Sequence, residues 1–310
     1  MANLKDIKNR IKSVESTKKI TRAMKMVAAA KVKKAESTVK ASRPFTQNLN
    51  TMFKKLLNSV GDFSTATLKI KSAVDNYPAL LKVREIKAVG LLVNSSNKGL
   101  AGAYNANVVR KTISRIEEYS SKGIKTYLFI IGQKGLSALK RRVKSYDCEI
   151  VKSYINVAAN PSAEGAKLIT EDLAEYFVSG KIDKIEIMTT RFKNMMSYFV
   201  EEWEVLPLKT ITEDSERLHD NVVDPLMEFE PDMHHILQKV VPMYITNIIY
   251  QSLLEAQASE LASRMTAMSA ATSNAEKMIA TLSIEYNKSR QAAITQEIVE
   301  VVGGANAQMG

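Results

Sequence analysis

The chain has 310 residues, of which 45% are hydrophobic and 25% are charged. This composition excludes an intrinsically disordered protein, because the chain can bury a sizeable apolar core. No run approaches the roughly 18 apolar residues of a membrane-spanning helix, and the charged N-terminus lacks the apolar segment of a signal peptide. A single cysteine, Cys148, excludes a disulfide framework. We therefore expect a soluble, intracellular protein.

The net charge of +11 is concentrated near the N-terminus. Residues 1–60 contain 15 Lys and Arg and three acidic residues, whereas the remainder contains 29 basic and 30 acidic residues. Such a segment indicates an acidic partner: nucleic acid, an anionic membrane surface or an acidic protein face. Phe45 and Phe53 are the only aromatic residues there, which disfavours nucleic acid, and its alanine-rich centre is a weak membrane anchor.

Residues 1–60 are predicted to form one long helix. They contain no glycine and one proline, Pro44, which predicts a kink or local break near residue 43. Apolar residues recur at steps of three and four, the spacing of one helix face. The predicted stripe contains Leu4, Ile7, Ile11, Val14, Ile20, Met24, Val27 and Ala28.

Residues 61–232 are predicted to form a central domain with connecting segments at residues 61–85 and 207–232. Apolar runs alternate with helical patterns, which is typical of a doubly wound α/β (Rossmann-like) domain with a mostly parallel sheet. The predicted strands are Ile86–Val93, Ile124–Ile131, Glu149–Ser153, Lys184–Arg191 and Tyr198–Leu206. The predicted helices are Ala101–Ser121, Gln133–Arg142 and Ala163–Val178.

Residues 233–310 are predicted to form a second long helix, because Met243–Val302 contains neither glycine nor proline. Gly303 and Gly304 are predicted to end it. Alternating steps of four and three residues from Leu254 reach apolar or alanine residues at ten of thirteen positions as far as Gln296, which is a heptad pattern. The two terminal helices are therefore expected to pair as an antiparallel two-helix coiled coil, too long to fit within the central domain.

The surface of the C-terminal helix is unusually poor in charge. Between Ala256 and Ala275 only Glu260 and Arg264 are charged, and residues 291–302 are apolar on nearly every side. A helix that is apolar all round must be surrounded. Two arrangements remain open: a bundle of identical chains, or insertion of this helix end into a collar formed by other proteins.

No catalytic group of residues is evident. The loop Asn94–Asn105 follows a strand and opens a helix, but it lacks both common phosphate-binding glycine patterns, so its glycines are expected to form a tight turn. Ser95 and Lys98 match S-x-x-K by chance, since the companion motifs are missing. His234 and His235 are adjacent, and adjacent helical residues point about 100° apart, which disfavours a shared metal ion.

The sequence resembles the gamma subunit of F-type ATP synthases over essentially its whole length. Near the N-terminus, IKNRIKSV from Ile7 and TKKITRAMKMVAAAK from Thr17 are similar to the family's first helix. GLAGAYN from Gly99 is similar to a family loop, although Ala101 stands where cysteine is common. Near the C-terminus, LEAQASE, ASRMTAM and YNKSRQAAITQE complete the resemblance. No insertion with a cysteine pair is present, so the bacterial type is expected rather than the thiol-switched chloroplast type.

The resemblance implies a non-catalytic rotor in the central stalk of the complex. It implies as partners three α and three β subunits, the epsilon subunit and a membrane c-ring, and it implies that rotation couples ion flow to ATP synthesis or hydrolysis on the β subunits. Mg-ATP and ADP would bind there, with no cofactor on this chain and no nucleic acid partner. The location would be the cytoplasmic face of the bacterial plasma membrane, with indirect membrane association.

The resemblance also assigns contact residues. Met24 and its basic neighbours would lie near acidic loops of the β subunits, and three residues of the last helix would form polar contacts with the collar of α and β subunits. The implied contact residues are Lys18, Lys19, Arg22, Met24, Lys25, Arg264, Gln291 and Thr295. One alternative stays open: a basic coiled-coil protein that binds nucleic acid or an anionic membrane surface. A nucleotide-binding enzyme that uses Asn94–Asn105 is a further alternative.

Overall fold

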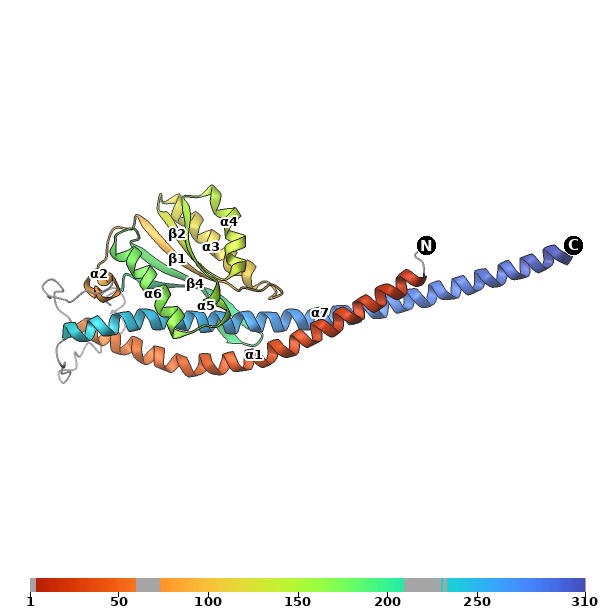
Figure 1. Ribbon diagram of the computed structural model, residues 1–310, viewed down its shortest axis with the longest axis horizontal. Coiled ribbons are helices and arrows are strands. Elements are labelled where there is room, and N and C mark those ends of the chain that lie inside the picture. The colour runs from red at the N-terminus through yellow and green to blue at the C-terminus, as the bar shows by residue number, and fades with distance from the viewer. Residues whose placement is uncertain (1–3, 60–72, 209–229, 231–232, 310) are drawn as a thin grey trace, which may run out of the picture. The chain divides into compact units, whose positions relative to one another are not determined.

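The computed structural model describes residues 4–59, 73–208, 230 and 233–309 (Figure 1). Most of the two predicted connectors therefore lies outside the described residues. The described chain is dominated by two long helices, α1 (Leu4–Ser59) and α7 (Met233–Met309).

The chain divides into two compact units. Met1–Ala30 and Arg264–Gly310 form the first unit, and Lys31–Ser263 forms the second. Both long helices contribute to both units. The three-part division into residues 1–60, 61–232 and 233–310 follows the predicted helices rather than these units, and it stays a prediction.

Five strands of the second unit form one sheet in the spatial order β3-β2-β1-β4-β5. The strands are β1 (Ala88–Asn94), β2 (Lys125–Ile131), β3 (Cys148–Tyr154), β4 (Lys184–Asn194) and β5 (Ser197–Leu206). Neighbouring strands are parallel except for β4 and β5, which form an antiparallel hairpin. All five predicted strands and the mostly parallel sheet are confirmed.

Helices connect the parallel strands. The helical segments between α1 and α7 are η1 (Ala73–Asp75), α2 (Tyr77–Leu81), α3 (Tyr104–Ser121), α4 (Gln133–Arg142), η2 (Val143–Ser145), α5 (Ile155–Ala159) and α6 (Ala163–Val178). The bounds of α4 and α6 agree with the prediction, and α3 begins three residues later than predicted. Ser162 caps α6, because its hydroxyl accepts a hydrogen bond from the Gly165 amide at 3.1 Å.

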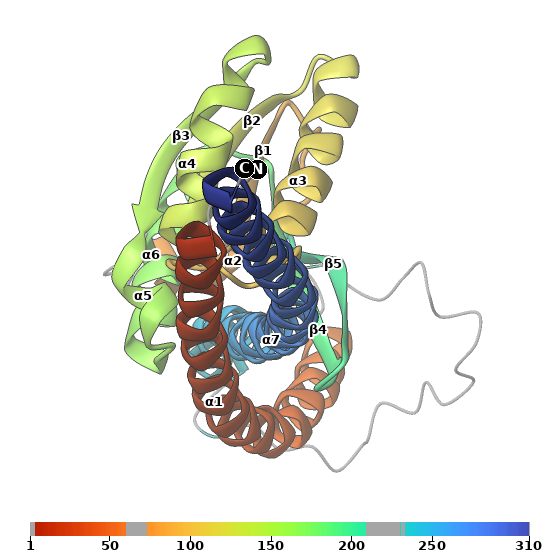
Figure 2. The same ribbon diagram turned by 90° about the vertical axis from the view of Figure 1, so that its right-hand side faces the viewer.

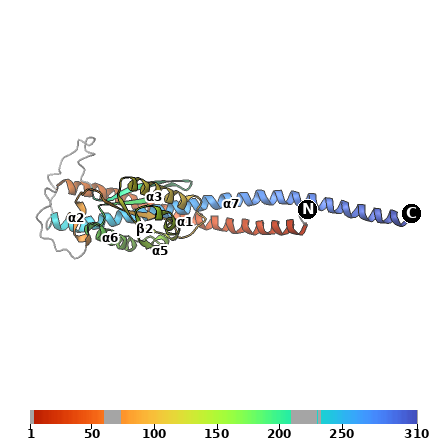
Figure 3. The same cartoon turned by 90° about the horizontal axis from the view of Figure 1, so that it is seen from above.

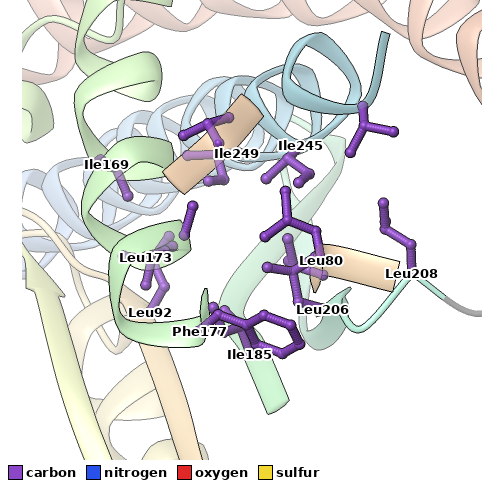
Figure 4. Packing of buried hydrophobic residues seen from close by; sticks show 14 of the residues in the cluster. Leu80, Leu92, Ile169, Leu173, Phe177, Ile185, Leu206, Leu208, Ile245 and Ile249 are labelled. Atoms are coloured by element: carbon purple, nitrogen blue, oxygen red, sulfur yellow. The ribbon is translucent and has the colours of Figure 1, made fainter. Parts of the chain in front are cut away.

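The sheet carries a separate apolar core on each face, because successive side chains of a strand point to opposite sides. Leu92 joins the core with α2, α6, the end of α1 and the start of α7, which Figure 4 shows from close by. Its neighbours Leu91 and Val93 join the core with α3 and α4. Helices on both faces of a mainly parallel sheet are the expected doubly wound arrangement (Figure 1).

The parts of α1 and α7 that belong to the second unit pack against each other in opposite directions. Ser42 donates a hydrogen bond to Gln251, and further along α1 Thr46 accepts one from Asn247 at 3.0 Å. An apolar cluster between the two helices contains Val32, Ala35, Val39, Leu254, Ala258, Leu261 and Ala262.

In the first unit, α1 and α7 lie side by side and antiparallel (Figures 2 and 3). Thr272 donates a hydrogen bond to Thr21 at 2.9 Å, and Lys18 lies 3.1 Å from Glu276, so residue numbers rise along α1 as they fall along α7. The final turns of α7 extend beyond the beginning of α1 (Figures 1 and 3). Those turns therefore have no neighbour from α1.

Two sequence-based expectations are corrected, and a third is narrowed. The helix α7 continues through Gly303 and Gly304 to Met309, so these glycines do not end it. Of the kink or local break predicted near residue 43, the break does not occur, because α1 continues through Pro44. Ile20 and Val27 are 60% and 58% exposed, so they are not on the packed stripe, which passes through Thr21 and the predicted Ala28.

Candidate functional site

The loop that links β1 to α3 lies where a doubly wound fold ordinarily binds its ligand. The sheet order reverses between β1 and β4, and the crevice outside the carboxyl ends of such strands is the usual ligand site. In this chain α7 fills that crevice. Asn94, the last residue of β1, donates hydrogen bonds to the Ser252 hydroxyl at 3.0 Å and to Thr189 at 3.1 Å. Thr189 in turn donates to the Ser252 carbonyl at 3.2 Å.

Little space remains beside α7. The cavity lined by Asn94, Tyr104, Gln257 and Glu260 has a volume of about 20 Å³. That volume accommodates about one water molecule, and a nucleotide needs a pocket of at least several hundred Å³. The crevice therefore holds a helix of the same chain, which removes the support for a nucleotide-binding enzyme that uses Asn94–Asn105.

Ser95, the start of the chance S-x-x-K match, has a structural role. Its hydroxyl donates to the Ile131 carbonyl at 2.6 Å and accepts from the Gly135 amide at 2.9 Å. Gly132 adopts a φ of +93°, and a Cβ there would collide with the Ser95 carbonyl. Gly102 has a φ of +53°, which confirms that it takes part in a tight strand-to-helix turn. The Ser95 hydroxyl is thus held by backbone groups and has no catalytic base among these partners.

The other reactive groups of the described residues form no catalytic arrangement. Burial raises the pKa of the Cys148 thiol to about 12, so this side chain is a neutral thiol at pH 7. No group of three or more His, Cys, Asp and Glu side chains that could hold a metal ion occurs within the described ranges.

The most buried carboxylate of the sheet, Glu186, is part of an ion-pair network. Arg115 donates two hydrogen bonds to it, at 3.0 and 2.7 Å, Tyr119 donates one at 2.7 Å, and the ammonium group of Lys184 lies 2.8 Å away. Burial by itself raises the pKa of Glu186, but these hydrogen bonds outweigh it and lower the pKa. A carboxylate held ionised by three donors joins α3 to β4 and is unsuited to proton transfer.

In the first unit, α1 exposes most of the basic residues assigned as contacts. Lys19, Arg22 and Lys25 are exposed, whereas Met24 is half-buried. Lys18 is also half-buried, and it pairs with Glu276 of α7. The exposed face of this segment thus carries a concentrated positive charge.

Apolar side chains of the same segment are exposed as well, and the predicted stripe did not separate them from the packed residues. Ile20, Met26 and Val27 are 60%, 61% and 58% exposed. The sequence could have indicated these exposed residues, because this segment contains more apolar residues than one helix face can hold. A surface that combines exposed apolar and basic side chains is suited to bind an acidic protein segment.

The assigned contact residues of α7 also belong to the first unit. Arg264 is half-buried, and Gln291 and Thr295 are exposed. The Thr295 hydroxyl donates to the Gln291 carbonyl at 2.9 Å, one turn earlier in the helix. The structure thus places all eight assigned residues in one unit, but on both helices.

The end of α7 is the most exposed apolar segment of the first unit. Five aliphatic side chains there are exposed by 46–71%: Ile294, Ile298, Val299, Val301 and Val302. These residues lie in the final turns, which have no neighbour from α1 (Figure 1). An apolar surface of this extent is typical of a segment that a protein partner covers.

Known proteins match the chain over nearly its whole length. A family model described as ATP synthase matches residues 3–308. The ATP synthase gamma chain of Synechococcus sp. (strain JA-2-3B'a(2-13)) is 41% identical over 99% of this chain and 100% of that protein, and the gamma chain of Gloeothece citriformis is also 41% identical over the same shares.

Solved structures agree with the sequence matches. The central stalk of the Tetrahymena thermophila mitochondrial ATP synthase contains a chain that is 25% identical, with a TM-score of 0.57 and coverage of 81% of this chain and 99% of that one. A chain of the Euglena gracilis mitochondrial ATP synthase shares the fold, with 15% identity, a TM-score of 0.65 and coverage of 98% and 94%. None of the described helices is both long enough and apolar enough to cross a membrane. The chain belongs to the ATP synthase gamma chain family.

Proposed function

We propose that this chain is the central-stalk rotor of an F-type ATP synthase and couples ion flow through a membrane c-ring to ATP synthesis and hydrolysis. In addition to family membership, the observation that supports this proposal is the exposed apolar end of α7. Five exposed aliphatic residues occupy turns that α1 does not reach. A rotor whose tip turns inside a collar of other subunits needs such a surface, because the collar supplies the missing apolar contacts.

The rotor acts by contacting its partners unequally. A shaft that binds one β subunit differently from the next favours a different conformation in each, and it can shift these equilibria only by the difference in its affinity for them. The coupling is reciprocal, so ATP hydrolysis on the β subunits drives the shaft backwards. The two helices of the first unit differ in charge, which supports this asymmetry: α1 is strongly basic, whereas α7 from Arg264 onwards carries four basic and four acidic residues.

The proposed partners are three α subunits, three β subunits, the epsilon subunit and the c-ring. Mg-ATP and ADP bind on the β subunits and not on this chain, whose ligand crevice is filled by α7. Attachment to the c-ring associates the chain indirectly with the cytoplasmic face of a bacterial plasma membrane. Nucleic acid is not among the proposed partners.

The proposed contacts with acidic loops of the β subunits are made by Lys19, Arg22, Met24 and Lys25. Lys18 belongs to the same group, although it must exchange or share its pairing with Glu276 to reach a partner. Arg264, Gln291 and Thr295 are proposed to contact the collar. The exposure of most of these side chains supports the assignment, since a buried residue could not reach another subunit.

The test is reconstitution with purified α and β subunits, followed by measurement of ATP hydrolysis and of rotation of a bead attached to this chain. We expect no ATP hydrolysis by the isolated chain and rotation in the complex. The double variant Arg22→Glu, Lys25→Glu is expected to lower the turnover of the complex at least tenfold. Its matched control is Lys33→Glu, Lys34→Glu, which reverses two exposed charges of the same helix in the second unit.

Two outcomes would contradict the proposal. Vigorous ATP hydrolysis by the isolated chain would show an enzyme. Failure to assemble with α and β subunits, together with tight and steeply salt-dependent binding to DNA or anionic vesicles, would favour the basic coiled-coil alternative.

A further inference from the structure

Glu255 of α7 connects three separate segments of the second unit. Its carboxylate accepts hydrogen bonds from Arg43 Nε at 2.8 Å and Arg43 Nη2 at 2.9 Å, and from the Phe192 amide at 2.8 Å. Arg43 lies on α1 and Phe192 lies on β4. The side chain of Glu255 is 1% exposed, so this carboxylate is shielded from water.

Further hydrogen bonds surround the contact between Arg43 and Glu255. Arg43 Nη2 also donates to the Phe192 carbonyl at 2.6 Å, so the guanidinium holds both α7 and β4. Gln251, one turn before Glu255, donates to the carboxylate at 3.1 Å and accepts a hydrogen bond from Ser42. Two turns of α7 are therefore tied to α1 and to the end of β4 by directed hydrogen bonds.

Apart from the hydrogen bonds of Asn247 with Thr46 and of Thr189 with Ser252, the remaining contacts between these elements are largely apolar. Ile245, Ile249 and Leu253 pack α7 into the core below the sheet, and Leu254 and Ala258 pack it against α1. Apolar contact is non-directional: it favours burial of surface area but does not fix the angle between two elements. A two-pronged guanidinium–carboxylate pair fixes angle as well as distance.

We propose that the Arg43–Glu255 pair is the torsional joint of the rotor, which makes α1, α7 and the sheet turn as one body. This inference rests on the proposed function. Both residues are positioning residues, since they act by holding other elements. The pair fixes the rotation of α7 about its own axis and its register against α1, and torque that enters through the α/β domain passes to the helices without slipping.

The test measures torsional stiffness in the assembled complex. The complex is anchored through its β subunits, and a bead is attached to the α/β domain through Lys140→Cys, an exposed position on α4. The angular fluctuations of the bead report how stiffly the domain is joined to the helices. ATP-driven ion pumping per ATP hydrolysed is measured on the same complexes.

Two variants loosen the joint without creating a large cavity. Arg43→Lys keeps the positive charge but cannot form the two-pronged contact, and Glu255→Gln keeps the size but removes the charge. In both we expect the variance of the bead angle to rise at least twofold and ions pumped per ATP to fall by at least half, while the unloaded rate of ATP hydrolysis changes less than twofold. The matched control is Arg115→Lys, which breaks the two-pronged contact with Glu186 inside the same domain, away from α1 and α7, and should leave stiffness unchanged.

The proposal is overturned if both variants show the stiffness and pumping of the unmodified complex. It is also overturned if Arg115→Lys loosens the complex equally, since the effect would then reflect general destabilisation. If neither variant assembles, hydrogen exchange of the isolated chains decides: faster exchange in α1 and α7 near the joint supports it, and unchanged exchange refutes it. A complex that never rotates, even unmodified, contradicts the proposed function instead.

Discussion

The two compact units use their apolar residues in opposite ways. The second unit buries large side chains such as Phe129, Phe177 and Leu80 between a sheet and helices. The first unit buries mainly small or polar residues, among them Thr21, Ala28 and Ala275, beside the larger Ile7 and Met268, and it leaves many of its other aliphatic residues exposed. One unit is thus stabilised by its own core, whereas the other presents apolar surface to partners.

This difference explains why the same kind of substitution should have different consequences in the two units. A change in the second unit alters the stability of the isolated chain. A change on the surface of the first unit should leave the isolated chain almost unaffected and act on the assembled complex.

Truncation of Phe177 should have the largest effect on stability. This side chain of α6 is fully buried in the core below the sheet, and the Arg84 guanidinium lies 4.5 Å from its ring centroid. We expect Phe177→Ala to lower the free energy of unfolding by about 3–5 kcal/mol. Urea denaturation followed by the fluorescence of Trp203, the single tryptophan of the chain, would measure it. Leu168→Ala on the same helix, where the side chain is 49% exposed, is the control and should change the value by less than about 0.5 kcal/mol.

Removal of the Arg115 charge that binds Glu186 should lower the free energy of unfolding nearly as much as the Phe177 substitution. The size of this effect should depend on pH. Arg115→Gln leaves a buried carboxylate without its main partner, at a cost of about 3 kcal/mol, the low end of the usual range because Arg115 is partly exposed. In the unmodified chain the lowered pKa of Glu186 contributes stability above the ordinary glutamate pKa of about 4.3, and this is lost as the pH falls through the lowered value.

In Arg115→Gln the pKa of Glu186 should rise toward its ordinary value, so the stability lost on acidification should become smaller than in the unmodified chain. Urea midpoints measured from about pH 7 down to about pH 2 would show the smaller loss. Arg110→Gln, an exposed substitution on the same helix, should leave the pH profile unchanged. Parallel profiles for Arg115→Gln and the unmodified chain would contradict the assigned role of Arg115.

A proline in α7 should disrupt the helix pair of the first unit and leave the stability of the second unit unchanged. Ala275 is buried between α7 and α1, and Ala275→Pro should cost about 3 kcal/mol of helix stability locally. We expect faster hydrogen exchange around residues 270–280 and an unchanged urea midpoint by Trp203 fluorescence. ATP synthesis by the complex should be lost. Ser273→Ala, at an exposed position of the same helix, is the control, and normal ATP synthesis by Ala275→Pro would refute the role of α7 as a shaft.

The smallest effect on the isolated chain should come from the end of α7. Ile298→Lys places a charge on a side chain that is 57% exposed, so the free energy of unfolding should change by less than about 0.5 kcal/mol. Assembly with α and β subunits, measured by co-purification, should nevertheless fall at least fivefold. Gln296→Lys adds the same charge two residues earlier at a polar exposed position, and equal losses in both variants would argue against an apolar contact at Ile298.

The sequence predicted most of the α/β domain because buried parallel strands appear as short apolar runs between helical patterns. It missed α2 and α5, since a helix of five residues spans little more than one turn and its apolar spacing is not repeated. It placed Ile20 and Val27 on the packed stripe because periodicity alone cannot show which of two apolar faces meets the neighbouring helix. It ended α7 at Gly303, where a glycine disfavours but does not forbid a helix.

The candidate site was less predictable because its contacts join residues far apart in the chain. Arg43 and Glu255 are separated by 212 positions, and neither residue type by itself indicates a partner. The filling of the crevice by α7 likewise depends on Ser252 reaching Asn94, 158 positions away. The contact residues of the first unit came from the family resemblance, and they stay predictions until a partner is present.

The condition of Cys148 makes this chain convenient for attaching probes. Because burial raises the pKa of this thiol to about 12, it is almost wholly protonated at pH 7, and only the ionised form reacts readily with maleimides. A cysteine introduced on an exposed helix would ionise at an ordinary pKa of about 8.5 and react far faster. Dyes, beads and spin labels can therefore be directed to a chosen position without first replacing the native residue.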